Sequence, residues 1–344
     1  MAKQKDIEQG LGDLISKIDK IYGKGSIIKM DEAPDYDYDV IPTGSLMLDL
    51  ALGINGFPRG RVVEMYGAES SGKTTVSLHA IAEAQKLGLN AAFVDVEHAF
   101  DKKYAESLGV QMDKLLFSQP TTAEEALEIV NMLVDSGKLG IIVIDSVAAL
   151  VPKSELEGEM GDSKMGIMAR LMSQAMRKLT GSVSKSNTLV VFLNQTRLKI
   201  GIVFGNPTTT PGGEALKFYS SIRCEVSRGQ QVKDGDEVTA NKTKVKVIKN
   251  KCAPPFKVAE FQIEFGKGID RMLEIIDLAV AADIIQKSGS WYSYDDVKIG
   301  QGVNNVKVTL NDNPDLLDEI ENKVKEVYIS GTVELESIEE IGDE

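Results

Sequence analysis

The sequence predicts an α/β protein built on a mostly parallel central sheet, and two observations carry this prediction. Between residues 40 and about 268, short apolar runs alternate with longer amphipathic stretches, the pattern of strands joined by crossover helices. One of these runs leads directly into G-A-E-S-S-G-K-T at residues 67–74, which matches the phosphate-binding pattern G-x-x-x-x-G-K-[ST]. A strand, such a loop and a helix in succession favour a nucleotide-binding α/β fold.

The first segment of the chain predicts a helix that lies outside this alternation. Within residues 6–30 the apolar positions recur on one helical face, at Leu11, Leu14, Ile15, Ile18, Ile21 and Tyr22. Residues 1–33 are therefore interpreted as a helical arm. Two alternatives stay open, because the apolar face can pack on a neighbouring subunit or on the protein's own core.

The predicted core covers residues 34–269. Its candidate parallel strands are 61–66, 91–96, 140–145 and 189–194, and candidate crossover helices include 75–87, 121–136 and 166–181. Three later strands, at 220–227, 243–249 and 257–264, are separated by much shorter connections. Short connections favour antiparallel neighbours, so these strands predict an antiparallel extension of the sheet.

Residues 270–330 predict a small second α/β domain. A helix is expected over 269–287, followed by a hairpin-like piece that contains the run W-Y-S-Y, and then by a helix over 315–328. The last eleven residues, from Glu334, carry six acids and no base. Residues 331–344 are therefore expected to form a disordered acidic tail.

Composition restricts the classes of protein to which the chain can belong. The chain has 344 residues, a net charge of −13 and no apolar stretch long enough to span a membrane. Its two cysteines and two histidines make a zinc site improbable, and with no signal-peptide pattern the expected location is the cytoplasm. Five lysines within residues 242–251 form a local basic cluster, so the acidic total does not exclude nucleic acid as a partner.

Each residue type in the phosphate-binding loop has its own expected role. Gly67 and Gly72 let the backbone curl so that its N–H groups face the phosphates of a nucleoside triphosphate. Lys73 is expected to reach the β- and γ-phosphates, and the hydroxyl of Thr74 is expected to bind Mg²⁺. The helix that begins here adds the positive end of its dipole.

Three further strands end in polar residues, and ligands of parallel sheets bind at those ends. Asp145 is expected to hold Mg²⁺ together with Thr74, and Glu97 is the candidate general base for the attacking water. His98 competes with Glu97 for this role but is more typical of a structural residue. Gln195 can hydrogen-bond the γ-phosphate, which would couple the nucleotide state to the loop that follows it.

Two long loops, 154–166 and 196–213, are of a length that is usually functional or disordered. Arg170 and Arg177 follow the first loop. No residue near the phosphate loop supplies a second cation for the transition state, so Lys249 and Lys251 are candidates to act from another subunit. The alternative is a solvated basic strand edge, which the spacing alone favours.

These stretches together resemble the bacterial RecA recombinase family over about residues 5–330. The most specific matches are 67–75, 94–99, 143–149, 158–177, 194–213, 215–223, 249–256 and 289–294. The resemblance implies a P-loop NTPase core of the RecA type and a DNA-dependent ATPase that uses ATP and Mg²⁺. It further implies helical homo-oligomeric filaments on single-stranded DNA that capture homologous double-stranded DNA, exchange strands and stimulate self-cleavage of a LexA-type repressor.

The resemblance also assigns residues. Glu97, Lys73, Gln195, Lys249 and Lys251 are implied to act in catalysis, the two lysines from the neighbouring subunit. Nucleotide contacts are implied for Gly67, Ala68, Glu69, Ser70, Ser71, Gly72, Lys73, Thr74, Thr75, Asp101, Tyr104, Asp145 and Phe265, with Thr74 and Asp145 holding the metal. DNA contacts are implied for Met165, Arg170, Ser173, Arg177, Arg197, Ile200, Gly212 and Gly213. Phe218 is implied to sense the nucleotide across the interface, and Lys287 and Lys298 to gather duplex DNA.

The chain departs from the family pattern at four places. Ala68 replaces a proline in the phosphate loop, Thr196 replaces an aliphatic residue, Phe265 replaces a tyrosine near the neighbouring subunit's nucleotide, and Val303 replaces a lysine. A ring-shaped helicase and a nucleotide-gated scaffold that activates partner proteins are the rival interpretations. The helicase would not need the loop 196–213 or the second domain. The intact Lys73, Glu97 and Asp145 weigh against a role as a scaffold alone.

Overall fold

The computed structural model describes residues 2–29, 38–159, 166–198, 208–333 and 335. The chain divides into two units, residues 1–38 and 39–344, and each is described by itself. In the first unit, helix α1 (Ala2–Tyr22) confirms the predicted helix, which ends before Gly23. The question of which surface its apolar face packs against stays a prediction.

The second unit contains a nine-stranded sheet in the order β13-β12-β11-β10-β3-β7-β6-β4-β5. Six neighbouring strands, from β10 to β5, are parallel, whereas β10, β11, β12 and β13 pair antiparallel. The predicted parallel core with an antiparallel extension is therefore confirmed. The strands are β3 (Val62–Gly67), β4 (Ala91–Asp95), β5 (Leu115–Ser118), β6 (Ile141–Asp145), β7 (Leu189–Gln195), β10 (Ile222–Asp234), β11 (Glu237–Asn250), β12 (Val258–Glu264) and β13 (Gly268–Ile269).

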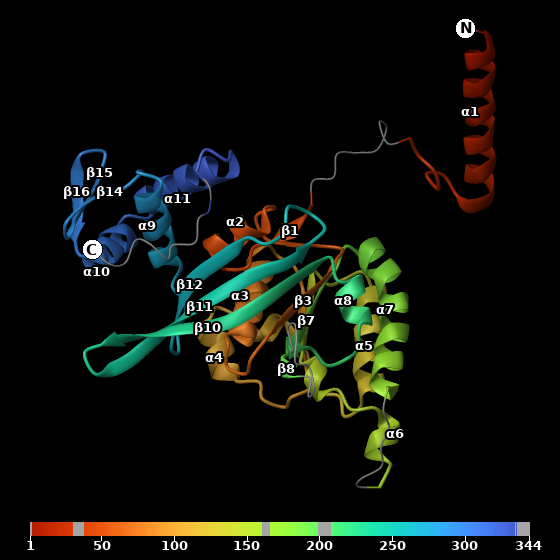
Figure 1. Cartoon of the computed structure of the whole chain (residues 1–344), viewed down its shortest axis with the longest axis horizontal. Helices are drawn as coiled ribbons and strands as arrows, with labels where there is room; N and C mark the ends of the chain where they lie inside the picture. Colours follow the sequence, from red (N-terminus) through yellow and green to blue (C-terminus); the bar gives the residue numbers. More distant parts are fainter. Residues whose placement is uncertain (1, 30–37, 160–165, 199–207, 334, 336–344) are drawn as a thin grey trace. The chain divides into compact units, whose positions relative to one another are not determined.

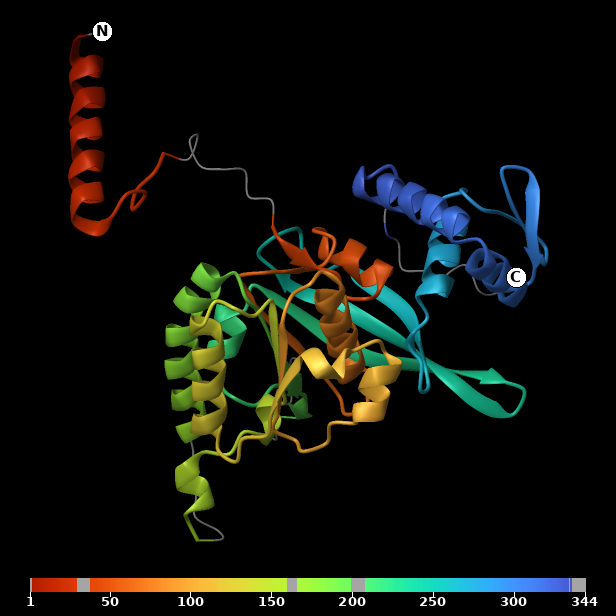
Figure 2. The ribbon, with the colours of Figure 1, turned by 180° about the vertical axis from the view of Figure 1, so that it is seen from behind.

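Helices cover both faces of this sheet, and the strand sequences show why. Val143 of β6 belongs to the apolar cluster that includes α3 (Lys73–Lys86), whereas its neighbours Ile142 and Ile144 belong to the cluster that includes α5 (Ala123–Asp135) and α7 (Ile167–Ser186). Successive side chains of a strand point to opposite faces, so a strand buried on both sides is a continuous apolar run. Figure 2 shows α5 and α7 side by side on one face.

Shorter elements complete the core. Among them, α2 (Leu46–Leu52), α8 (Ala215–Tyr219) and η2 (Val147–Ala149) contact the sheet, and α2 also packs on α9 (Arg271–Ala281). The remaining ones are β1 (Val40–Ile41), β2 (Phe57–Pro58), α4 (Lys102–Ser107), η1 (Met112–Lys114), α6 (Lys153–Leu156), β8 (Arg197–Leu198) and β9 (Thr208–Thr209).

Strands β10 and β11 are longer than the sequence predicts. Their ladder runs from Ile222 opposite Asn250 to Asp234 opposite Glu237, with register shifts on the way. Figure 1 shows the far part as a two-stranded ribbon that continues past the rest of the sheet. Its residues are largely polar, so the apolar alternation that marks a half-buried strand is absent there.

The last part of the unit carries its own three-stranded sheet, which confirms a small second α/β domain. The predicted helix over 269–287 is too long: α9 (Arg271–Ala281) ends before Asp283, which has a φ of 55°, and β14 (Gln286–Ser288) follows. Strands β15 (Trp291–Tyr294) and β16 (Val297–Gln301) complete the sheet. Helix α11 (Pro314–Ile329) was predicted, but α10 (Val303–Asp312) was not, because few of its residues are apolar. The domain bounds 34–269 and 270–330 remain predictions.

A buried carboxylate joins this second domain to the core. Glu274 of α9 is 1% exposed; its Oε1 lies 2.5 Å from Ser45 Oγ, and its Oε2 accepts a hydrogen bond of 3.0 Å from Leu46 N. It therefore binds the first turn of α2, whose free N–H groups need acceptors. Burial raises the pKa of Glu274 to about 8 and, one turn along α2, that of Asp49 to about 7.

The raised pKa of Glu274 predicts that the stability of the protein depends on pH. An unfolded glutamate titrates near pH 4.5, so the folded state binds more protons than the unfolded state between about pH 4.5 and 8, and the contribution of Glu274 is lost as the pH rises through this window. Glutamine cannot ionise, so the unfolding free energy of Glu274→Gln should not fall in this window. We expect it to rise by about 2 kcal/mol relative to that of the natural protein between pH 6 and pH 8.5. Urea unfolding at both pH values measures this difference. The exposed Glu128→Gln serves as the control, and a gain equal to that of the control would contradict the prediction.

Candidate nucleotide site

The phosphate-binding loop joins β3 to α3. Gly67 ends β3 so close to β10 that a Cβ there would lie 2.0 Å from the Val226 carbonyl oxygen, and Gly72 has a φ of 98° that favours glycine. Helix α3 begins with Lys73, so its first N–H groups and the positive end of its dipole face the loop. The local sequence thus forms an anion site, as predicted from the motif.

Lys73 is held at the centre of this loop. It is 7% exposed, and its Nζ donates hydrogen bonds to the carbonyl oxygens of Ala68 (2.7 Å) and Gly67 (3.3 Å) and to Ser71 Oγ (3.4 Å). Burial lowers the pKa of Lys73, and the carboxylates of Asp145, Glu97 and Glu69 oppose this shift. The ammonium group is therefore placed where a phosphate would supply the missing negative charge.

Thr74 and Asp145 meet as the sequence predicts. Thr74 Oγ1 donates a hydrogen bond of 2.7 Å to Asp145 Oδ2. Asp145 is 8% exposed, and burial raises its pKa to about 6, although Thr74 and Lys73 both lower it. A hydroxyl and a carboxylate are the hard oxygen donors that Mg²⁺ prefers.

The donor set fits a metal that is shared with a ligand. In the described part of the chain, no group of three or more His, Cys, Asp or Glu side chains could hold a metal ion. Mg²⁺ in nucleotide sites is typically held by one or two protein oxygens, with substrate phosphates and waters completing its shell. Thr74 and Asp145 match this arrangement.

The ends of three parallel strands converge beside the loop. Glu97 follows β4, Ser146 follows β6 and Gln195 ends β7. Glu97 Oε1 accepts hydrogen bonds from both of the others, from Ser146 Oγ and from Gln195 Nε2, the latter at 3.0 Å. The predicted base and the predicted sensor are therefore directly hydrogen-bonded, a contact that the sequence did not indicate.

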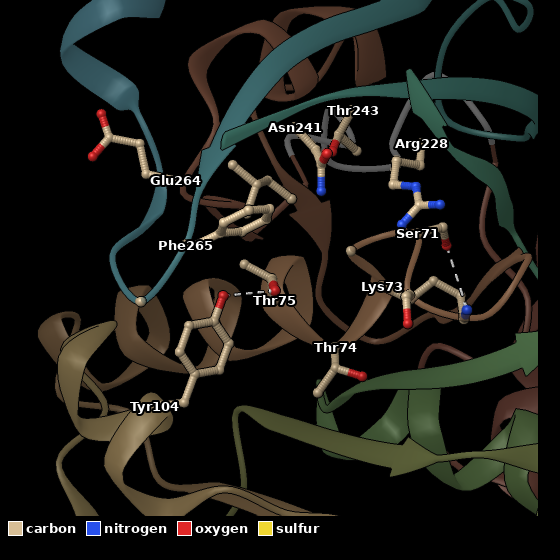
Figure 3. Close-up of a pocket in the computed structure, with 14 residues that line it drawn as sticks. Ser71, Lys73, Thr74, Thr75, Tyr104, Arg228, Asn241, Thr243, Glu264 and Phe265 are labelled. Atoms are coloured by element: carbon tan, nitrogen blue, oxygen red, sulfur yellow. Dashed lines mark hydrogen bonds between the residues drawn. The ribbon is translucent and has the colours of Figure 1, made fainter. Parts of the chain in front are cut away.

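A pocket of about 300 Å³ opens next to the loop (Figure 3). Tyr104 and Thr75 share a hydrogen bond of 2.9 Å between their hydroxyl oxygens, and Phe265 lies near them, whereas Arg228 lies near Ser71 and Lys73. The lining residues are Ser70, Ser71, Gly72, Lys73, Thr74, Thr75, Tyr104, Arg228, Asn241, Thr243, Ile263, Glu264, Phe265 and Gly266.

Arg228 and Asn241 belong to this lining and were not predicted from the sequence. Arg228 is a cation beside the phosphate loop of its own chain, so the expectation that none lies there is wrong. Phe265 lines the pocket of its own chain. Asn241 contributes a buried Oδ1 with no hydrogen-bond partner among the described residues. All three come from the antiparallel extension, and only the sheet order places them next to the loop.

Five predicted nucleotide residues are not among the described residues that line the pocket: Gly67, Ala68, Glu69, Asp101 and Asp145. Asp101 caps α4, where its Oδ1 accepts a hydrogen bond of 3.0 Å from Tyr104 N, so it orients the helix that carries Tyr104. Glu69 is exposed on the loop and contributes to the field at Lys73.

Lys249 and Lys251 lie at the end of β11 and bind the end of α8. Lys249 Nζ donates to the carbonyl oxygens of Lys217 (2.7 Å) and Phe218 (3.0 Å), and Lys251 Nζ donates to that of Phe218 (3.4 Å). Burial lowers the pKa of Lys249, and the nearby Lys251 lowers it further. The Phe218 side chain is 70% exposed. Neither lysine is among the described residues around the pocket of its own chain.

The predicted DNA residues gather around α7 and the strands that follow β7. Arg170, Ser173 and Arg177 are spaced by three and four residues along α7, which places them on one face, and both arginines are exposed. Arg197 is exposed on β8, which pairs with β9. Gly212 and Gly213 pack near Met172 and Ala169 of α7. Met165 and Ile200 lie outside the described residues.

Comparisons with known proteins agree with this architecture. The family model of the RecA N-terminal domain matches residues 9–270, and that of the RecA C-terminal domain matches residues 273–329. A curated relative named Protein RecA from Ruminococcus albus is 60% identical over 92% of this chain and 80% of its own length. Those from Methylococcus capsulatus and Bacillus subtilis are 59% and 57% identical, each over 94% of this chain and 93% of their own length.

A solved structure supports the fold alone. The crystal structure of the RadB recombinase aligns with 67% of this chain and 98% of its own, with a TM-score of 0.51 and 22% identity. A search of the described residues for an apolar helix of membrane-spanning length finds none. Because two family models together cover almost the whole chain and the relatives share more than half of its residues, the chain belongs to the RecA family, the DNA-dependent ATPases of homologous recombination.

Proposed function

We propose that this chain binds ATP with Mg²⁺ at the phosphate loop and hydrolyses it while bound to DNA. The observation that carries the proposal is the convergence of Glu97, Ser146 and Gln195 beside Lys73 and Thr74. Lys73 binds the β- and γ-phosphates, and Thr74 and Asp145 hold the metal. The metal, when bound, neutralises charge that develops on the phosphate oxygens.

Glu97 acts as the general base. Its carboxylate is exposed and anchored through one oxygen, Oε1, by Ser146 and Gln195. Among the described residues, no hydrogen bond engages the other oxygen, which can accept a proton from a water positioned in line with the γ-phosphate. Ser146 thus orients the base, as a second group commonly does in sites of this kind.

Gln195 links this chemistry to the DNA-binding region. Its amide donates to Glu97, and a γ-phosphate at the loop would compete for the same donor. Gln195 ends β7 and β8 begins at Arg197, so the residue that would sense the γ-phosphate lies directly before the segment to be ordered. We propose that nucleotide state orders loop 196–213 in this way, and that loops 154–166 and 196–213 bind single-stranded DNA.

At the level of the assembly, we propose helical filaments on single-stranded DNA, with Lys249 and Lys251 completing the neighbour's site. Their placement beside exposed Phe218 and away from the lining of their own pocket supports this role. The filament captures homologous duplex DNA and exchanges strands. By family resemblance, we further propose a cytoplasmic location and stimulation of LexA-type repressor cleavage.

Strand exchange between homologous and non-homologous DNA pairs tests this proposal. ATP hydrolysis with and without single-stranded DNA is measured in parallel, and electron microscopy separates helical filaments from closed rings. Exchange restricted to homologous pairs, with DNA-stimulated hydrolysis, is the expected result. Closed rings that unwind duplexes without pairing would overturn the recombinase assignment.

Arg197 provides a quantitative prediction for the DNA contacts. If its exposed guanidinium contacts a phosphate, Arg197→Ala should weaken binding across DNA sequences and reduce the slope of log K against log salt by about one unit. Fluorescence anisotropy with single-stranded DNA at several salt concentrations measures this slope. Lys86→Ala, which removes a surface cation paired with Glu83 at the far end of α3, is the control. An unchanged slope would remove Arg197 from the interface.

A further inference from the structure

His79 connects two walls of the nucleotide pocket that come from distant parts of the sequence. It lies on α3, six residues after Lys73, and its Nε2 accepts a hydrogen bond of 3.0 Å from the backbone N–H of Ile269 on β13. The motif of the phosphate loop ends before this position, and neither the site chemistry nor the DNA contacts use this side chain.

The hairpin of β12 and β13 carries one wall of the pocket. Ile263 pairs with Ile269 and Glu264 with Gly268, so the tight turn between them consists of residues 265–267. Phe265 and Gly266 of this turn line the pocket. In the ladder, β13 is the edge strand, so its outer side is held by α3 rather than by another strand.

The packing around the imidazole leaves little room for another arrangement. A Cβ on Gly268 would lie 2.3 Å from His79 Nε2, and one on Gly44 would lie 2.7 Å from His79 Cβ. Two glycines thus let the backbone approach the ring closely, one of them inside the hairpin. The distance between α3 and the hairpin is therefore set at this side chain.

The imidazole is neutral, as an acceptor must be. Burial lowers the pKa of His79 to about 4; Glu83 of α3 opposes the shift, whereas Lys86 of α3 and Arg271 of α9 add to it. A neutral ring with Nε2 as acceptor carries its proton on Nδ1. The Ile269 amide would otherwise be a donor without a partner at a partly buried position.

We infer that His79 is a positioning residue for nucleotide binding, which fixes the hairpin carrying Phe265 and Gly266 at the distance from the phosphate loop that an adenosine group requires. The inference rests on the proposed nucleotide site. It assigns to His79 an effect on the adenosine half of the ligand, and none on the phosphate half, because the loop itself does not depend on this hydrogen bond.

Two closely similar substitutions separate this role from general packing. In His79→Gln the side-chain amide reaches the position of Nε2, so its oxygen can accept from Ile269. In His79→Asn the amide ends near the position of Nδ1 and cannot reach. We expect Asn to weaken ADP binding about tenfold and Gln to stay within twofold of the natural protein, because only Asn leaves the amide unpaired.

Calorimetric titration with Mg–ADP and with Mg–tripolyphosphate tests the inference. Tripolyphosphate, which lacks adenosine, should bind all three proteins equally, and His79→Asn should raise the KM for ATP with little change in kcat. The inference would be overturned if both variants bind ADP with the same affinity, whether unchanged or weakened. It would also be overturned if His79→Asn weakens tripolyphosphate binding as much as it weakens ADP binding. If the natural protein binds tripolyphosphate but not ADP, the proposed nucleotide site itself is wrong.

Discussion

A Glu97→Gln variant is expected to bind ATP and single-stranded DNA as the natural protein does, yet to hydrolyse ATP about 10²–10⁴ times more slowly. The reason is geometric as well as chemical. The amide is isosteric with the carboxylate and can keep one oxygen on the Ser146 and Gln195 donors, so the strand ends stay joined. It cannot, however, accept a proton from water.

Single-turnover hydrolysis with saturating DNA measures this effect, and nucleotide binding by calorimetry shows that the site is intact. Glu106→Gln on α4 is the matched control, because it neutralises an exposed acid that pairs with Lys102 on the same helix. Turnover near that of the natural protein would remove Glu97 from the role of base. In that case Asp145, whose pKa burial raises to about 6, becomes the group to test.

The parts of the site that lie in one motif could be predicted from sequence. Lys73 and Thr74 follow from a loop whose backbone conformation requires glycines, and Asp145 follows from an apolar run closed by an acid. The parallel order of strands also let Glu97 and Gln195 be placed at one edge. What could not be foreseen is that Gln195 donates directly to Glu97, because two long side chains can meet in many ways.

Arg228 and Asn241, which were not predicted at the site, lie on strands distant in sequence from the phosphate loop. Arg228, Asn241 and Phe265 reach the pocket because β10 pairs with β3 and brings β11 and β12 with it. No local pattern marks Arg228 or Asn241, since the residues around them are largely polar. Helix α9 was predicted too long because residues 282–285 continue its apolar pattern. The helix nevertheless ends at Ala281, since Asp283 adopts a φ of 55°.

The second large effect concerns the interface between subunits. Lys251→Ala is expected to abolish most DNA-stimulated ATP hydrolysis while isolated subunits still bind ATP. Lys251 donates to the Phe218 carbonyl oxygen at 3.4 Å, a long contact that leaves the ammonium largely free to bind elsewhere. A cation supplied from a neighbour to a phosphoryl transition state is worth about 10³–10⁵ in rate in related systems.

Mixing experiments distinguish action across subunits from action within one. In a filament of Glu97→Gln and Lys251→Ala subunits, some interfaces pair an intact Glu97 with an intact Lys251. Each variant alone has none, so mixed filaments should regain hydrolysis, with a maximum near equal proportions. Lys246→Ala, on the exposed part of β11, is the control for loss of general basic charge.

The outcome depends on whether Glu97 and Lys251 serve the same nucleotide from different chains. With a within-chain role, every subunit in the mixture would carry one defect, and mixing would restore nothing. We propose the first case, since Lys249 and Lys251 bind α8 beside exposed Phe218, whereas Glu97 is bound to Ser146 and Gln195 at the strand ends. Mixed filaments that form normally but stay inactive would show that the two lysines bind DNA or stabilise α8 instead.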